Sequence, residues 1–81
     1  MMKYEVQIAI KEGVLDPEME TLQRLLKRSG VKGVRQLTHT ERFLLEFDDG
    51  VDAAEAERLT RTIAGDVLAN PEIHDWTVGP A

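Results

Sequence analysis

The chain contains no cysteine. Without a thiol it can form no disulfide, no thiolate zinc site, no cysteine-ligated iron–sulfur cluster and no cysteine nucleophile. The lack of cysteine also suits a reducing compartment, so we expect a cytoplasmic protein. No apolar run is long enough to span a membrane, and the first residues do not resemble a secretory signal. We therefore expect no membrane partner.

Phosphate-binding loops are missing as well. Neither the G-x-x-x-x-G-K-[ST] motif nor the G-x-G-x-x-G motif is present. Acidic residues outnumber basic ones by 15 to 10, which gives a formal net charge of −5, and the basic residues form no stripe. Because such a chain is a poor ligand for a phosphate backbone, we expect no nucleic-acid partner.

The sequence offers little chemistry for a metal or catalytic site. Its two histidines, His39 and His74, have no second histidine at helical or hairpin spacing. The acidic residues between 48 and 55 do not follow the calcium-loop pattern, which needs Gly at its sixth position and Glu at its twelfth. The loop over residues 12–16 has no arginine to hold an anion, as an acyl-phosphate hydrolase would need. We therefore predict no metal ligand and no catalytic residue.

The chain changes from a strand to a helix between Gly13 and Pro17. Gly13 tolerates the positive φ of a sharp turn. Asp16 is typical of a helix N-cap, and Pro17 fits the first helical position, where its missing N–H costs nothing. We expect Val14 and Leu15 to hold this connection against the core.

Apolar residues at helical spacing predict two amphipathic helices. The first follows the Asp16 cap and ends near Ser29, with Gly30 just beyond its end. Its apolar stripe consists of Met19, Leu22, Leu25 and Leu26.

The second predicted helix begins at Asp52, which forms a capping box with Glu55. It ends at Asn70 and Pro71, because Asn can adopt the left-handed conformation and Pro cannot continue a helix. Gly65 lowers helix propensity, so we expect a close packing contact there. The expected buried stripe consists of Ala53, Ala56, Leu59, Ile63, Ala64, Val67 and Leu68.

Alternating apolar and polar residues predict strands over residues 3–11, 42–47 and 73–78, with a weaker strand over residues 31–37. The two middle runs predict a hairpin, and one long bent strand is the alternative. The resulting order is β-α-β-β-α-β in a single domain, residues 1–81. The simplest packing is a ferredoxin-like α+β fold, an antiparallel sheet with two helices on one face.

Two stretches resemble the PurS subunits of phosphoribosylformylglycinamidine synthase. Residues 11–17, K-E-G-V-L-D-P, are similar to the first loop of that family. Residues 68–76, L-A-N-P-E-I-H-D-W, are similar to its last passage from helix to strand, L-A-N-P-x-I-x-x-[YW]. The chain departs from the family at Met19, where Gly is frequent, and over residues 36–40, which lack a Gly-Lys pair.

The resemblance implies a non-catalytic role in de novo purine synthesis. The PurS-like chain would form a homodimer or larger oligomer and join a glutaminase subunit to a large synthetase subunit, so that ammonia passes between them. ATP, Mg²⁺ and glutamine would be used by those partners, leaving this chain without a cofactor. The positions carried over are structural or interface residues: Gly13, Asp16, Pro17, Asn70, Pro71 and Trp76.

Size gives independent support for self-association, because a domain of 81 residues buries a smaller share of its surface than a larger domain does when folded alone. A regulatory module of the ACT type is the alternative function, since it shares the expected topology and also dimerises. Such a module would need a ligand-binding turn after the first strand, where Gly13 is the one hint.

Overall fold

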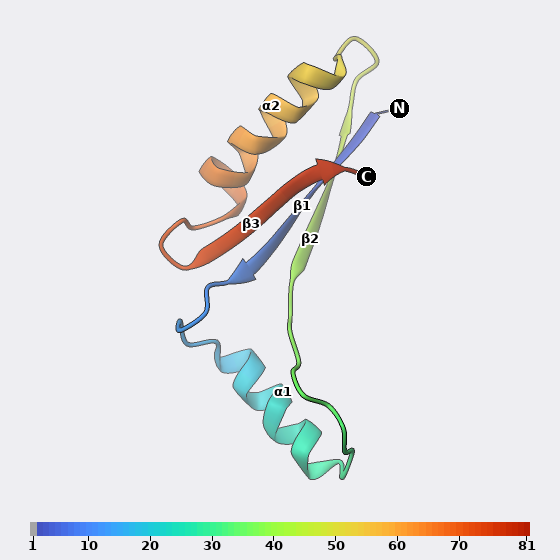
Figure 1. Ribbon diagram of the computed structural model, residues 1–81. Coiled ribbons are helices and arrows are strands. Elements are labelled where there is room, and N and C mark those ends of the chain that lie inside the picture. Colours follow the sequence, from blue (N-terminus) through green and yellow to red (C-terminus); the bar gives the residue numbers. More distant parts are fainter. Residues whose placement is uncertain (1) are drawn as a thin grey trace.

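The protein is described by a computed structural model over residues 2–81, and its centre is a three-stranded antiparallel sheet. Strand β1 (Met2–Ile10) lies between β2 (Glu41–Phe47) and β3 (His74–Pro80) (Figure 1). Val6 on β1 lies opposite Phe43 on β2 and Val78 on β3. This register gathers the alternating apolar residues of all three strands on one face of the sheet, as the sequence predicts.

Helix α2 (Ala53–Ile63) covers that face and continues as a π-helical turn, η1 (Ala64–Leu68). Its main sheet contacts are with β1 and β3. Tyr4, Val6 and Ile8 are buried beneath it, and the Tyr4 hydroxyl donates a hydrogen bond to the Ala53 carbonyl at 3.2 Å. The side chain of Asp52 accepts from the Glu55 N–H at 2.8 Å, which confirms the predicted start of this helix.

Three residues of α2 and η1 differ from the predicted buried stripe. Ala53 was expected in the stripe but is exposed, because it lies in the first turn at the end of the helix. Val67 is 73% exposed, because the wider π turn rotates the residues after Ile63 away from the α-helical positions. Thr60 is fully buried, although the pattern of apolar residues does not include it. Its hydroxyl donates a hydrogen bond to the Ala56 carbonyl at 2.7 Å, so the buried polar group has a partner.

Helix α1 (Pro17–Arg28) forms where predicted, but it does not pack on the sheet. None of its residues is buried, and Figure 1 shows it beyond one end of the sheet. The expectation that both helices cover one face is therefore wrong for α1. Val14 and Leu15 are 37% and 67% exposed, so they do not hold the connection against the core either.

Residues 31–40 form no strand. The segment returns from the end of α1 in an extended path that leads into β2 (Figure 1), and Gly33 within it has a φ of +92°. The predicted hairpin is wrong, because no strand of the described chain pairs with this segment. The α+β, ferredoxin-like β-α-β-β-α-β class is confirmed, with its sheet reduced to three strands. We call residues 17–40 the arm.

Candidate functional site

The two stretches that carry the family resemblance meet at one end of the sheet. Ile10, at the end of β1, lies opposite His74, at the start of β3. The Lys11 N–H then donates a hydrogen bond to the Ile73 carbonyl at 2.8 Å. Residues 11–17 and 68–76 are therefore neighbours in space, and we call this region the junction.

The first half of the junction holds three of the predicted site residues in structural roles. Gly13 has a φ of +85°, which turns the chain away from β1. Asp16 caps α1, since its Oδ1 accepts from the Met19 N–H at 3.2 Å. Pro17 occupies the first helical position, as expected.

The second half contains Asn70, which does not adopt the left-handed conformation, because every positive φ among residues 2–81 is at a glycine. The helix ends at Ala69 in an extended conformation instead. The Asn70 side chain accepts from the Glu72 N–H at 3.0 Å, and its backbone N–H donates to His74 Nδ1 at 2.8 Å. Asn70 and His74 thus fix the loop that leads to β3.

Trp76 is half-buried on β3 and packs against the core cluster. It also lines a shallow groove of about 460 Å³ together with Lys11, Pro71, His74 and Asp75. The groove therefore combines residues of both family stretches, among them the ammonium of Lys11, the carboxylate of Asp75 and the indole of Trp76. Its lining includes no serine, threonine or cysteine that a base could activate as a nucleophile.

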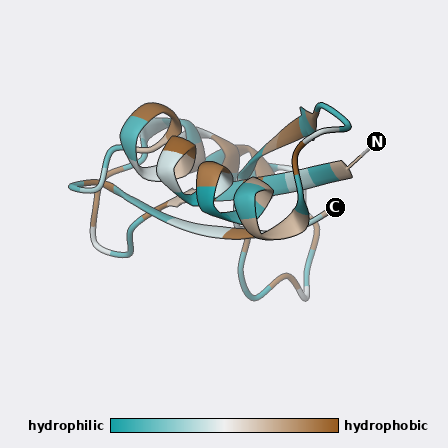
Figure 2. Cartoon of the chain, turned by 90° about the horizontal axis from the view of Figure 1, so that it is seen from above, coloured by the Kyte–Doolittle hydropathy of each residue, from teal (hydrophilic) through white to brown (hydrophobic). Residues whose placement is uncertain are grey.

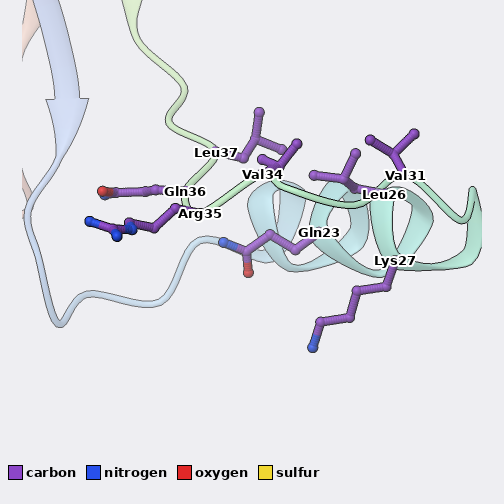
Figure 3. Close-up of a pocket in the computed structure, with 8 residues that line it drawn as sticks. All are labelled: Gln23, Leu26, Lys27, Val31, Val34, Arg35, Gln36 and Leu37. Atoms are coloured by element: carbon purple, nitrogen blue, oxygen red, sulfur yellow. The ribbon is translucent and has the colours of Figure 1, made fainter.

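A second groove, of about 330 Å³, lies on the arm between α1 and the extended segment that follows it. Figure 3 shows Leu26, Val31, Val34 and Leu37 pointing to the same side, while Lys27 extends to the opposite one. Hydrophobic and hydrophilic stretches alternate along the helices in Figure 2. The arm therefore forms a thin two-element layer with one apolar side.

The resolved pKa shifts lie on α2, away from both grooves. The hydrogen bonds from the Arg58 guanidinium, at 2.6 and 3.0 Å, lower the pKa of the Glu55 carboxyl. The same hydrogen bonds raise the pKa of Arg58. This i,i+3 pair stabilises the solvent side of the helix.

Within residues 2–81, no group of three or more metal-ligating side chains is close enough to hold an ion. The described helices are also too short and too polar for any of them to cross a membrane.

The fold and its grooves define a small ferredoxin-like α+β domain with a protruding arm. The family model of PurS, described as phosphoribosylformylglycinamidine (FGAM) synthase, matches residues 3–80, so the chain belongs to the PurS family. The PurS subunit of phosphoribosylformylglycinamidine synthase from Mycobacterium leprae is 35% identical over 78 residues, which cover 96% of this chain and 94% of the relative.

Solved structures agree. The crystal structure of Methanocaldococcus jannaschii PurS, described as one of the subunits of formylglycinamide ribonucleotide amidotransferase, superposes with a TM-score of 0.83 at 28% identity and covers 100% of this chain and 96% of that one. A chain in the structure of PurLQS from Thermotoga maritima has a TM-score of 0.66 at 20% identity, with 99% and 96% covered. At that identity it shows the shared fold.

The arm is the feature that sequence reasoning missed. The four leucine and methionine residues of α1 indicate an apolar stripe but not what covers it. Two signals were present: residues 36–40 depart from the family pattern, and the weak strand pattern over residues 31–37 contains Gly33.

Proposed function

We propose that this chain is the small non-catalytic subunit of phosphoribosylformylglycinamidine synthase in purine biosynthesis. It would hold the glutaminase subunit beside the large ATP-dependent synthetase, so that ammonia reaches the second site without loss to solvent. The observation that carries the proposal is the family match over residues 3–80. ATP, Mg²⁺ and glutamine are bound by the partners in this account, and the complex acts in the cytoplasm.

The side chains that the sequence contains and lacks support a non-catalytic role for this chain. Glutaminase chemistry of the expected kind uses a cysteine nucleophile, and this chain has no cysteine. It also lacks the two phosphate-binding motifs that would indicate a nucleotide site of its own. A subunit without reacting groups can still raise a rate by fixing two sites in a productive geometry. One chain in the structure of PurLQS from Thermotoga maritima has the same fold as this chain.

Two surfaces of this chain suit the contacts of an assembly subunit. The groove at the junction carries the family positions Pro71 and Trp76 beside Lys11 and Asp75, and we propose that it contacts a partner subunit. The apolar side of the arm suits a second copy of the chain, and we propose that the protein forms a homodimer.

Sedimentation of the purified subunits tests the assembly role. We expect the glutaminase, the synthetase and this chain to form one ternary complex, and the first two alone to sediment separately. Asp75→Lys, in the groove, should weaken the complex more than tenfold. Glu57→Lys is the matched control, because it reverses an exposed charge on α2 that forms only a surface ion pair with Arg61. A ternary complex that forms equally well without this chain would contradict the proposal.

A further inference from the structure

The loop between η1 and β3 is closed by hydrogen bonds between its two ends, Asn70 and His74. The His74 N–H donates to the Asn70 carbonyl at 2.8 Å. In the opposite direction, the Asn70 N–H donates to His74 Nδ1, also at 2.8 Å. The Asn70 side chain adds a third bond, because its Oδ1 accepts from the Glu72 N–H at 3.0 Å. Of these three bonds, only the one to the imidazole can be broken by the uptake of a proton.

The bond to Nδ1 fixes the protonation state of the ring. A backbone N–H can only donate, so Nδ1 must present a free lone pair. The His74 imidazole is therefore neutral in this structure, with its proton on Nε2. An imidazolium carries protons on both nitrogens, so it would set the Nδ1–H against the Asn70 N–H. The closed loop and a protonated His74 consequently exclude each other.

This contact lies at the groove of the junction, which His74 lines together with Lys11, Pro71, Asp75 and Trp76. Pro71 belongs to the loop that the contact closes, so loosening of the loop would displace one wall of the groove. Protonation of His74 would also add a positive charge to the groove. A single proton would thus change both the shape and the charge of this surface.

Charged side chains of the neighbouring elements act on the ring in opposite directions. Lys11, which follows β1, disfavours a second positive charge in the groove, whereas Asp75 on β3 favours one. Two further carboxylates, those of Asp66 on η1 and Glu72 in the loop, are not among the residues that line the groove. The contact that distinguishes the two forms of the ring directly is therefore the hydrogen bond from the Asn70 N–H.

We propose that His74 is a pH-sensitive latch on the groove of the junction. The neutral ring holds the Asn70 N–H and keeps the loop closed. Histidine takes up a proton between about pH 8 and pH 5, and over this range the bond is lost and the loop loosens. The sign follows from proton binding: the open loop binds one proton more than the closed loop, so acid favours the open form.

The latch belongs to this chain rather than to the family motif. The pattern L-A-N-P-x-I-x-x-[YW] specifies Asn70 but leaves position 74 open, and histidine occupies it here. The role of the groove as a partner contact rests on the proposed function. The latch itself is an intramolecular contact, so it can be tested on the chain alone.

NMR spectra of the isotopically labelled full chain at about pH 8 and about pH 5 test the latch. At the higher pH we expect the tautomer of His74 with its proton on Nε2. The Asn70 amide should then be protected from hydrogen exchange, relative to an unstructured peptide at the same pH. At the lower pH this protection should fall roughly tenfold, because one hydrogen bond is lost.

Two variants locate the titrating group. His74→Asn can present its Oδ1 at the position of Nδ1, and this oxygen accepts a hydrogen bond without taking up a proton. The variant should keep the Asn70 amide protected at both pH values. His39→Asn is the matched control, because it removes the other histidine of the chain. It should leave the pH dependence of the Asn70 amide as in the natural chain.

Three results would overturn the latch. The first is a His74 tautomer with its proton on Nδ1 at the higher pH, and the second is equal protection of the Asn70 amide at both pH values. The third is a pH dependence that persists in His74→Asn, since the titrating group would then lie elsewhere. If that variant does not fold, the first two measurements on the natural chain still decide. Failure of the latch would leave the assembly role standing, because sedimentation of the three subunits tests that role separately.

Discussion

A β-carbon placed on Gly65 would lie 3.3 Å from Cζ2 of Trp76. The glycine sits in the π turn η1, where the widened helix passes over the indole of β3. Most β-carbons in proteins lie farther than this from their nearest neighbouring atom. The indole can therefore occupy its position because residue 65 has no side chain. The sequence predicts a close packing contact at Gly65, and the structure confirms it.

Replacement of Gly65 by Ala should therefore destabilise the protein. The gain in helix propensity, up to about 1 kcal/mol, is opposed by overpacking against the indole, which costs about 1–3 kcal/mol. We expect a net loss of about 1 kcal/mol in the free energy of unfolding and a change in the fluorescence of Trp76, the only tryptophan. Gly50→Ala is the control, since nothing lies within 4 Å of its added β-carbon. Equal stability of the two variants would contradict this packing account.

Loss of each of the two helix caps should destabilise a different part of the structure. Asp52→Ala removes the cap of α2, which packs on the sheet, and should lower the free energy of unfolding by about 0.5–2 kcal/mol. Asp16→Ala removes the equivalent hydrogen bond from α1 and should cost a similar amount. Its effect should concentrate in the hydrogen exchange of α1 amides, because α1 buries no residue within its own chain. Uniform loss of protection across the sheet in Asp16→Ala would contradict this.

The pKa of Glu55 should depend on Arg58. The hydrogen bond from Arg58 lowers the pKa of the carboxyl, so the pair stabilises the folded state at neutral pH. That contribution is lost as the pH falls through the lowered pKa of the folded state. In Arg58→Gln we expect the Glu55 pKa, measured by carboxyl NMR, to rise toward its ordinary value. Arg61→Gln removes the neighbouring ion pair with Glu57 and should leave the pKa of Glu55 unchanged. An unchanged Glu55 titration in Arg58→Gln would refute the assignment.

Local patterns predicted most of the fold. The alternation of Tyr4, Val6 and Ile8 predicts the central strand and its buried face, because strand periodicity decides both together. The caps Asp16 and Asp52 predict the starts of both helices to the residue. These features depend on neighbours a few positions away in the chain.

The features that were missed do not follow from neighbours a few positions away in the chain. The apolar stripe of α1 predicts that another element covers this face of the helix. The stripe alone does not distinguish the chain's own sheet from the sheet of a second copy. The π turn that exposes Val67 depends on how α2 ends above Trp76. At the candidate site, the family motifs predicted structural residues such as Gly13, Asp16 and Pro17. Nothing in the sequence predicted that the two stretches meet, as the hydrogen bond from the Lys11 N–H to the Ile73 carbonyl shows.

The most direct test of the central claim is the ratio of glutamine-supported to ammonia-supported turnover by the glutaminase and synthetase, with and without this chain. If the chain couples two active sites that it does not contain, glutamine-supported activity should collapse when it is omitted. Activity with high free ammonia should fall much less, because the synthetase keeps its own site. A ratio that stays the same without this chain would contradict the coupling role and favour a regulatory module instead.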